Sequence, residues 1–159
     1  MVPRIEKLKE KKLVGHHIKM SLIQNKTGLL WKSFAPKIKE IQNKVSQDKI
    51  SMQIYPANYY KDFSPGNEFE KWATVEVEDF ESVPDGMNSF NLEGGLYAVF
   101  DYKGSSTDTS IFEYIFREWL PASDFQIDDR PHFEVLGENY KNNDPDSEEE
   151  IWIPVKEKS

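Results

Sequence analysis

The fold is decided by three segments in the last third of the chain: FEYIFREWL at 112–120, RPHFEV at 130–135 and IWIPV at 151–155. The first has apolar residues three or four apart, which predicts an amphipathic helix that Pro121 helps to end. The other two predict strands. Glu134 is a lone carboxylate between apolar neighbours, and Trp152 interrupts the apolar alternation of its strand. We interpret this combination as part of a pocket.

The segments around this region predict a cycle of elements that occurs twice. In the first half, alternating polarity predicts strands at 12–22, 50–56 and 68–80, and Gly15 is consistent with a bulge. Apolar residues from Leu30 to Val45 recur three or four apart and predict a helix, which Pro36 should kink or shift. The first half therefore follows the order strand, helix, strand, strand.

The second half follows the same order. Strands are predicted at 96–103, 132–136 and 151–155, with an additional short strand at 88–92. Asp108 or Thr109 can cap the helix that contains FEYIFREWL. We predict one domain over residues 1–159, with pseudo-repeats at about 12–80 and 94–156.

Each half carries a tryptophan in its last strand. Trp72 precedes Ala73, and Trp152 precedes Ile153. Because side chains alternate across a strand, both tryptophans should leave the face that packs on the helices. Two interpretations stay open: the rings form the walls of a cleft on the far face, or they cover a loop or a dimer contact.

Composition limits the classes of function. The 20 basic and 28 acidic residues give a net charge of −8, which disfavours a direct nucleic-acid partner. The chain has no cysteine, which excludes disulfides, thiolate metal sites and a cysteine nucleophile and is consistent with the reducing cytoplasm. No apolar run approaches the roughly 20 residues of a membrane helix. We therefore predict a cytoplasmic protein that does not bind membranes.

Four segments resemble a known family: 94–104, 118–123, 131–135 and 151–156. They are similar to the bacterial effector-binding domain, also called the gyrase-inhibitor-like small-molecule-binding domain. That domain is the sensory part of some multidrug-responsive and AraC-type transcription activators. The first half matches mainly in its order of elements and in Leu30, Trp31 and Phe34.

The resemblance implies an α+β fold, in which a duplicated strand-helix-strand-strand unit forms an antiparallel sheet with two helices packed against it. It also implies a cleft for lipophilic, often cationic or aromatic, ligands. The family match places the pocket carboxylate at Glu134 and an aromatic wall at Trp152. The family often has a tyrosine at the position of Leu136, so one hydroxyl is missing here. Further candidates for the walls are Trp72, Tyr55 and Tyr97, although core or rim packing is an alternative for the two tyrosines.

Other kinds of chemistry have weaker signals. His16, His17 and His132 lack the spacing of a metal site, and no serine lies in a Gly-x-Ser-x-Gly elbow, so we predict no metal and no cofactor. We expect a stand-alone small-molecule-binding protein rather than a DNA reader, and its oligomeric state stays open. Two alternatives remain: a hydrolase with Glu134 as general base, and a protein-protein inhibitor like the namesake of the family.

Overall fold

The computed structural model describes residues 2–159. Its strands are β1 (Arg4–Leu8), β2 (Lys11–Met20), β3 (Lys44–Ile54), β4 (Phe69–Val77), β5 (Asn88–Leu92), β6 (Gly95–Lys103), β7 (Phe125–Ile127), β8 (His132–Leu136) and β9 (Glu148–Glu157). Its helical segments are α1 (Thr27–Phe34), the 3₁₀ helix η1 (Ala35–Glu40), α2 (Ser110–Tyr114), the π-helical η2 (Ile115–Trp119) and α3 (Leu120–Ala122).

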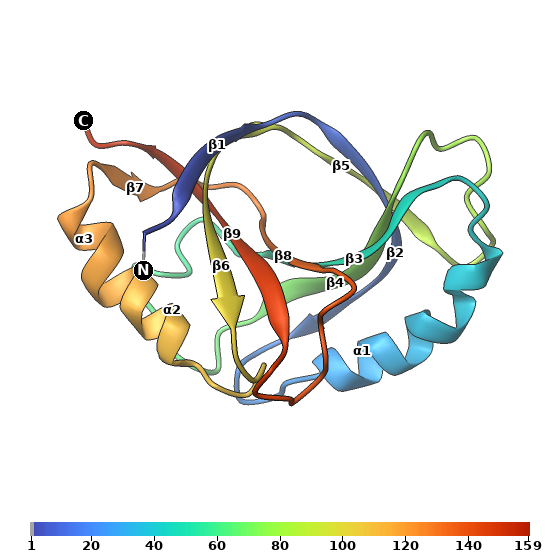
Figure 1. The fold of residues 1–159 in the computed structure, drawn as a ribbon, viewed down its shortest axis with the longest axis horizontal. Coiled ribbons are helices and arrows are strands. Elements are labelled where there is room, and N and C mark those ends of the chain that lie inside the picture. Colours follow the sequence, from blue (N-terminus) through green and yellow to red (C-terminus); the bar gives the residue numbers. More distant parts are fainter. Residues whose placement is uncertain (1) are drawn as a thin grey trace.

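The strands form one curled antiparallel sheet with helices on its outside (Figure 1). Their order is β1-β6-β9-β8-β3-β4-β2-β5, and β7 pairs with β9. The two halves meet at the centre, where β3 of the first half pairs with β8 of the second. This arrangement confirms the predicted α+β fold with an antiparallel sheet and two helices against it.

The sheet curls because β1 and β2 form one continuous ribbon, which pairs along its length with a second ribbon formed by β5 and β6. Leu8 of β1 lies opposite Gly95 of β6, and Lys11 of β2 lies opposite Leu92 of β5, so both pairs follow the same register. Gly94 lies between β5 and β6, where the second ribbon comes close to the backbone of Leu8 in the first. A Cβ atom there would lie 2.1 Å from the carbonyl oxygen of Leu8, so only glycine fits.

Two kinds of core follow from the curl. The inner core is enclosed by the sheet and includes Trp72, Tyr97, Phe133 and Trp152. On the outer face, α1 covers β2 and β4 through Leu30 and Phe34, whereas α2 and η2 cover β6 and β9 through apolar residues that include Ile111 and Ile115. The two helices therefore lie over the flanks of the sheet.

Several predicted boundaries need correction. The helix predicted to reach Val45 is α-helical only to Phe34, because Pro36 has no N–H to donate to the carbonyl four residues earlier, and the chain continues as η1. Val45 is an exposed residue of β3, which begins at Lys44. The register of β2 on β4 shows no shift at Gly15, so this glycine does not mark a bulge. The short strand β7 had not been predicted.

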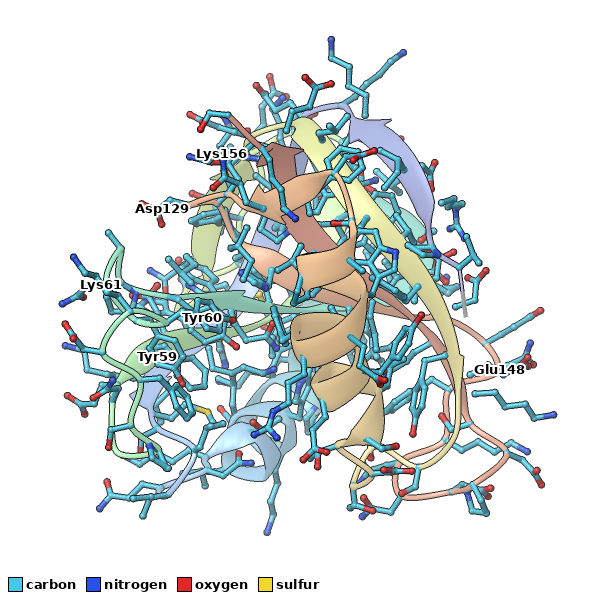
Figure 2. All side chains as sticks on the ribbon, turned by 90° about the vertical axis from the view of Figure 1, so that its left-hand side faces the viewer. Tyr59, Tyr60, Lys61, Asp129, Glu148 and Lys156 are labelled. Carbon is cyan, nitrogen blue, oxygen red and sulfur yellow. The ribbon has the colours of Figure 1, made fainter. Side chains whose placement is uncertain are left out.

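The connection between β3 and β4 forms an aromatic loop, defined here as residues 55–68. It carries Tyr59 and Tyr60, which lie beside the helix that contains η2 (Figure 2). The rings of Tyr60 and Phe116 have centroids 5.5 Å apart. This contact links the loop of the first half to the helix of the second.

Candidate functional site

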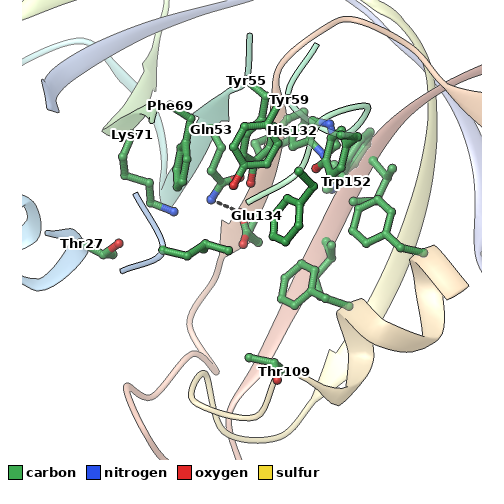
Figure 3. Close-up of a pocket in the computed structure, with 18 of the residues that line it drawn as sticks. Thr27, Gln53, Tyr55, Tyr59, Phe69, Lys71, Thr109, His132, Glu134 and Trp152 are labelled. Carbon is green, nitrogen blue, oxygen red and sulfur yellow. Dashed lines mark hydrogen bonds between the residues drawn. The ribbon is translucent and has the colours of Figure 1, made fainter. Parts of the chain in front are cut away.

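A groove of about 670 Å³ lies on the outer face of the sheet between the two helical layers (Figure 3). Its floor comes from β3, β4, β8 and β9, and its sides come from the start of α1, from α2 with η2, and from the aromatic loop. The groove exists because α1 and α2 cover the flanks of the sheet and leave the central strands open.

Glu134 lies on the floor of this groove. It is opposite Ile151 of β9, a residue that packs with α2, and directly opposed residues share a face of the sheet. Glu134 therefore points to the helix-bearing side. Its Oε2 accepts a hydrogen bond of 3.0 Å from Nε2 of Gln53 (Figure 3). This bond fixes the carboxylate in position and leaves it free to accept further bonds.

Lys71 is a second charged residue of the floor. It lies opposite Gln53 in the register of β3 and β4, and only 7% of it is exposed. Burial lowers the pKa of its ammonium group, while the charges of Glu134 and Glu149 act in the opposite direction. The same cluster affects Glu149, because burial and the nearby Glu134 raise its pKa to about 7, against a lowering by Lys71.

Aromatic side chains form one side of the groove. The ring of Tyr55 has centroid distances of 4.5 Å to Tyr59, 4.9 Å to Phe69 and 5.0 Å to His132. Burial raises the pKa of Tyr55, so its hydroxyl stays neutral. Burial, followed by the charge of Arg130, lowers the pKa of His132 to about 3, so its ring is neutral at pH 7. This wall offers flat apolar contact area with neutral polar edges.

The opposite side comes from α2 and η2. The N–H of Leu120 donates to the carbonyl of Ile115, five residues earlier, and Pro121 has no N–H. Short π-helical segments of this kind are frequent at functional sites. The helix contributes Phe112 and Phe116 to the groove, together with two charged residues, Glu113 and Arg117.

The predicted site residues separate into two groups. Glu134, Tyr55 and Trp152 line the groove, although Trp152 is only 9% exposed and its ring stacks on Phe133 at 5.1 Å in the inner core. Trp72 and Tyr97 are not among the lining residues. Their participation in binding stays a prediction, but the geometry does not bring them to this groove.

Trp72 and Tyr97 both belong to the inner core, and each makes further contacts outside the groove. Trp72 stacks on His17 at 4.3 Å, and its Nε1 donates to Glu70. The hydroxyl of Tyr97 donates to the carbonyl of Pro131 at 2.8 Å. Both tryptophans point away from the face that packs on the helices, as the strand period predicts. The face on which they lie is the concave inner face of the curled sheet, where they are buried. The expectation that Trp72 and Glu134 line one cleft on the face away from the helices is therefore corrected: Glu134 lies on the face that bears the helices, and Trp72 lies on the opposite face.

Sequence reasoning missed Lys71 and the aromatic loop. One signal for Lys71 was present: FEKWATVEV has a lysine where the repeat, aligned on Trp72 and Trp152, has Ile151. The loop gave no such signal, because its position over the groove depends on the paths of β3 and β4. Among residues 2–159 there is no group of three or more His, Asp or Glu side chains that could hold a metal ion. No helix within that range is long and apolar enough to cross a membrane.

Comparisons with known proteins agree with this architecture. The model of the family described as integron-associated effector binding protein, Cass2, matches residues 4–155. The chain is 28% identical over 130 residues to the transcriptional regulator BrlR of Pseudomonas aeruginosa, an alignment that covers 80% of this chain and 46% of BrlR. The chain therefore spans about half the length of this curated relative.

Two solved structures share the fold. One is SAV2435 bound to tetraphenylphosphonium, with a TM-score of 0.76 at 16% identity, covering 98% of this chain and 94% of that one. The other is the integron cassette protein VCH_CASS2 of Vibrio cholerae, with a TM-score of 0.64 at 18% identity, covering 96% of this chain and 95% of that one. At identities this low, the structural similarity shows a common fold and nothing more.

Proposed function

The chain belongs to the family of integron-associated effector binding proteins, and on this premise we propose that it captures a lipophilic, positively charged or aromatic small molecule in the groove between α1 and α2. The observation that carries the proposal is Glu134, a carboxylate on the floor of a groove with aromatic walls. Binding then either sequesters the ligand or changes the affinity of the protein for a partner.

Electrostatics support a cationic ligand. A carboxylate in a partly dry groove has lost hydration, so an arriving cation interacts with it more strongly there than at the surface. The ring faces of Tyr55 and its neighbours add contact area, and cation-π attraction contributes about 0.5–2 kcal/mol, depending on desolvation. The neutral ring of His132 adds no opposing charge at pH 7.

Tetraphenylphosphonium is a suitable probe for this proposal, because SAV2435, a protein of the same fold, has been solved with it. It joins a permanent positive charge to four apolar rings. It has no titratable group, so any change of its affinity with pH reflects titration of the protein alone.

We expect Glu134→Gln to weaken the binding of tetraphenylphosphonium by about tenfold, or about 1.4 kcal/mol. The substitution removes the charge but keeps an oxygen that can accept the bond from Gln53. Isothermal titration calorimetry at pH 7 measures the dissociation constant. Glu148→Gln is the matched control, because Glu148 is an exposed residue at the start of β9 outside the groove (Figure 2).

Equal affinities of wild type and Glu134→Gln would contradict the role of Glu134. The absence of saturable binding to the wild type would contradict cation capture by the groove. Trp152→Ala provides a second test, since Trp152 contacts both the groove and the inner core, and removing its ring should weaken binding in a protein that still unfolds cooperatively.

A further inference from the structure

We propose that Lys71 makes the groove selective for ligands that carry an anionic or strongly hydrogen-bond-accepting group next to their cationic body. The preferred ligand is then a zwitterionic aromatic amphiphile rather than a simple lipophilic cation. This inference rests on the proposed function, because it specifies the ligand class of the same groove.

The ammonium group of Lys71 is a buried donor that lines the groove. The residue is only 7% exposed, and no hydrogen bond or ion pair of its Nζ to another side chain or backbone group is found within residues 2–159. An ammonium has three N–H donors and no acceptor. Figure 3 shows the nitrogen of Lys71 directed into the groove, on the same side as Thr27. A ligand oxygen placed there would receive charge-assisted hydrogen bonds.

Lys71 does not serve as the ion-pair partner of Glu134. The carboxylate takes its hydrogen bond from the neutral amide of Gln53, although Lys71 lies directly opposite Gln53 in the next strand. Both charges are thus held on one floor without being paired. The floor presents a carboxylate on β8 and an ammonium on β4, one on each side of β3, which matches a ligand that has both signs of charge.

The charges around the groove are also balanced. Four ordinarily charged residues line it, two basic (Lys71 and Arg117) and two acidic (Glu113 and Glu134). A permanent cation near Glu134 therefore meets repulsion from Lys71. A zwitterion satisfies the two floor charges together.

A purely structural role explains Lys71 poorly. The repeat places Ile151 at the equivalent position of β9, where it packs with α2 at 1% exposure. A branched apolar residue thus fits this position in the other half of the fold. Burying an ammonium group instead costs free energy unless a partner compensates it. The charges of Glu134 and Glu149 compensate part of this cost, and hydrogen bonds to a ligand acceptor supply the rest.

The test uses two dyes with one scaffold: rhodamine 110, which has a free carboxylate, and its methyl ester rhodamine 123, which is a net cation. Fluorescence anisotropy at pH 7 gives both dissociation constants. We expect the wild type to bind rhodamine 110 about tenfold more tightly than rhodamine 123. In Lys71→Met this ratio should fall to one or below, and rhodamine 123 should bind more tightly than to the wild type.

Two further variants separate this inference from the proposed function. Lys156→Met is the matched control, because Lys156 is an exposed lysine of β9 outside the groove (Figure 2), and it should keep the wild-type ratio. Glu134→Gln should weaken both dyes by a similar factor, since both carry the same cationic ring system. Thermal unfolding confirms that each variant is folded, and Lys71→Gln serves as a second neutral substitution.

Each result has one meaning. If both dyes bind and Lys71→Met and Lys71→Gln leave their ratio unchanged, the role of Lys71 is overturned while ligand capture stands. The same conclusion follows if the wild type binds the ester as tightly as the acid. If tetraphenylphosphonium binds the wild type saturably and neither dye does, only this inference fails; if none of the three compounds binds, the proposed function fails as well.

Discussion

Replacing Gly15 with alanine is expected to lower the free energy of unfolding by about 3 kcal/mol. A Cβ atom at this position would lie 1.9 Å from the carbonyl oxygen of Ala73 and 2.9 Å from the Cα of Thr74. These are backbone atoms of the neighbouring β4, so no side-chain rotation relieves the clash. Gly15 also lies between β4 and β5, and a shift of β2 would disturb both ladders. Urea unfolding followed by circular dichroism measures the change.

Gly28→Ala is the matched control for this substitution. Gly28 lies in α1, and no atom lies within 4 Å of a Cβ built there. Alanine is the better helix former, so this variant should be more stable by about 0.5–1 kcal/mol. A Gly15→Ala protein as stable as the wild type would show that β2 can move away from β4, contrary to the continuous register between them.

The second large effect concerns pH. When the pH falls from 7 to 5, the free energy of unfolding of the wild type is expected to fall by about 2 kcal/mol relative to that of His132→Phe. Burial and Arg130 depress the pKa of His132 from 6.5 to about 3 in the folded protein. The unfolded chain therefore binds a proton first. The contribution of the neutral ring is complete above pH 6.5 and is lost progressively as the pH falls towards 3.

Glu149 acts in the opposite direction. Its folded pKa is raised from 4.5 to about 7, so the folded protein binds the proton more tightly than the unfolded chain. Its contribution to stability is complete below pH 4.5 and is lost as the pH rises through 7. Between pH 5 and pH 7 the two residues therefore compensate each other. Urea unfolding at both pH values should show a steeper acid loss in Glu149→Gln than in the wild type.

The His132→Phe variant provides the complementary measurement. Phenylalanine keeps an aromatic ring beside Tyr55 and Phe116 but cannot take a proton. Its stability should rise relative to that of the wild type as the pH decreases from 7 to 5, because the loss from His132 is removed, whereas the effects of Glu149 and of His16, whose pKa burial also lowers, are the same in both proteins. Parallel pH profiles for the wild type and both variants would contradict these assignments.

Local patterns predicted most of the fold, and the reasons are specific. The spacing of Ile111, Phe112, Ile115 and Phe116 predicted the second helix, and alternation predicted β5, β6 and β8 within a residue or so of their bounds. The long first helix was wrong beyond Phe34, because its apolar spacing continues through a proline that ends α-helical hydrogen bonding. The three-residue β7 was missed, because its pairing with β9 carries no periodic signal.

The candidate site was predicted only in part. Glu134 could be chosen from the sequence, because it is a lone carboxylate in an apolar strand and the family resemblance places the pocket carboxylate there. Tyr55 was one of the candidates for an aromatic wall. Trp72 was placed beside Glu134, because alternation tells which residues share a face of a strand but not whether that face is open. Lys71 was not chosen, because a single lysine in a strand usually reaches solvent.

The sequence by itself determined the order of the elements, the duplication of the unit and the face of its strand on which each side chain lies, because these properties depend on residues close together in the chain. The tertiary structure alone decided which face of the sheet is open. The curl that joins β1 and β2 to β5 and β6 encloses the tryptophans, and the separation of α1 and α2 exposes the floor that carries Glu134 and Lys71. Both depend on contacts between the halves, which no local pattern encodes.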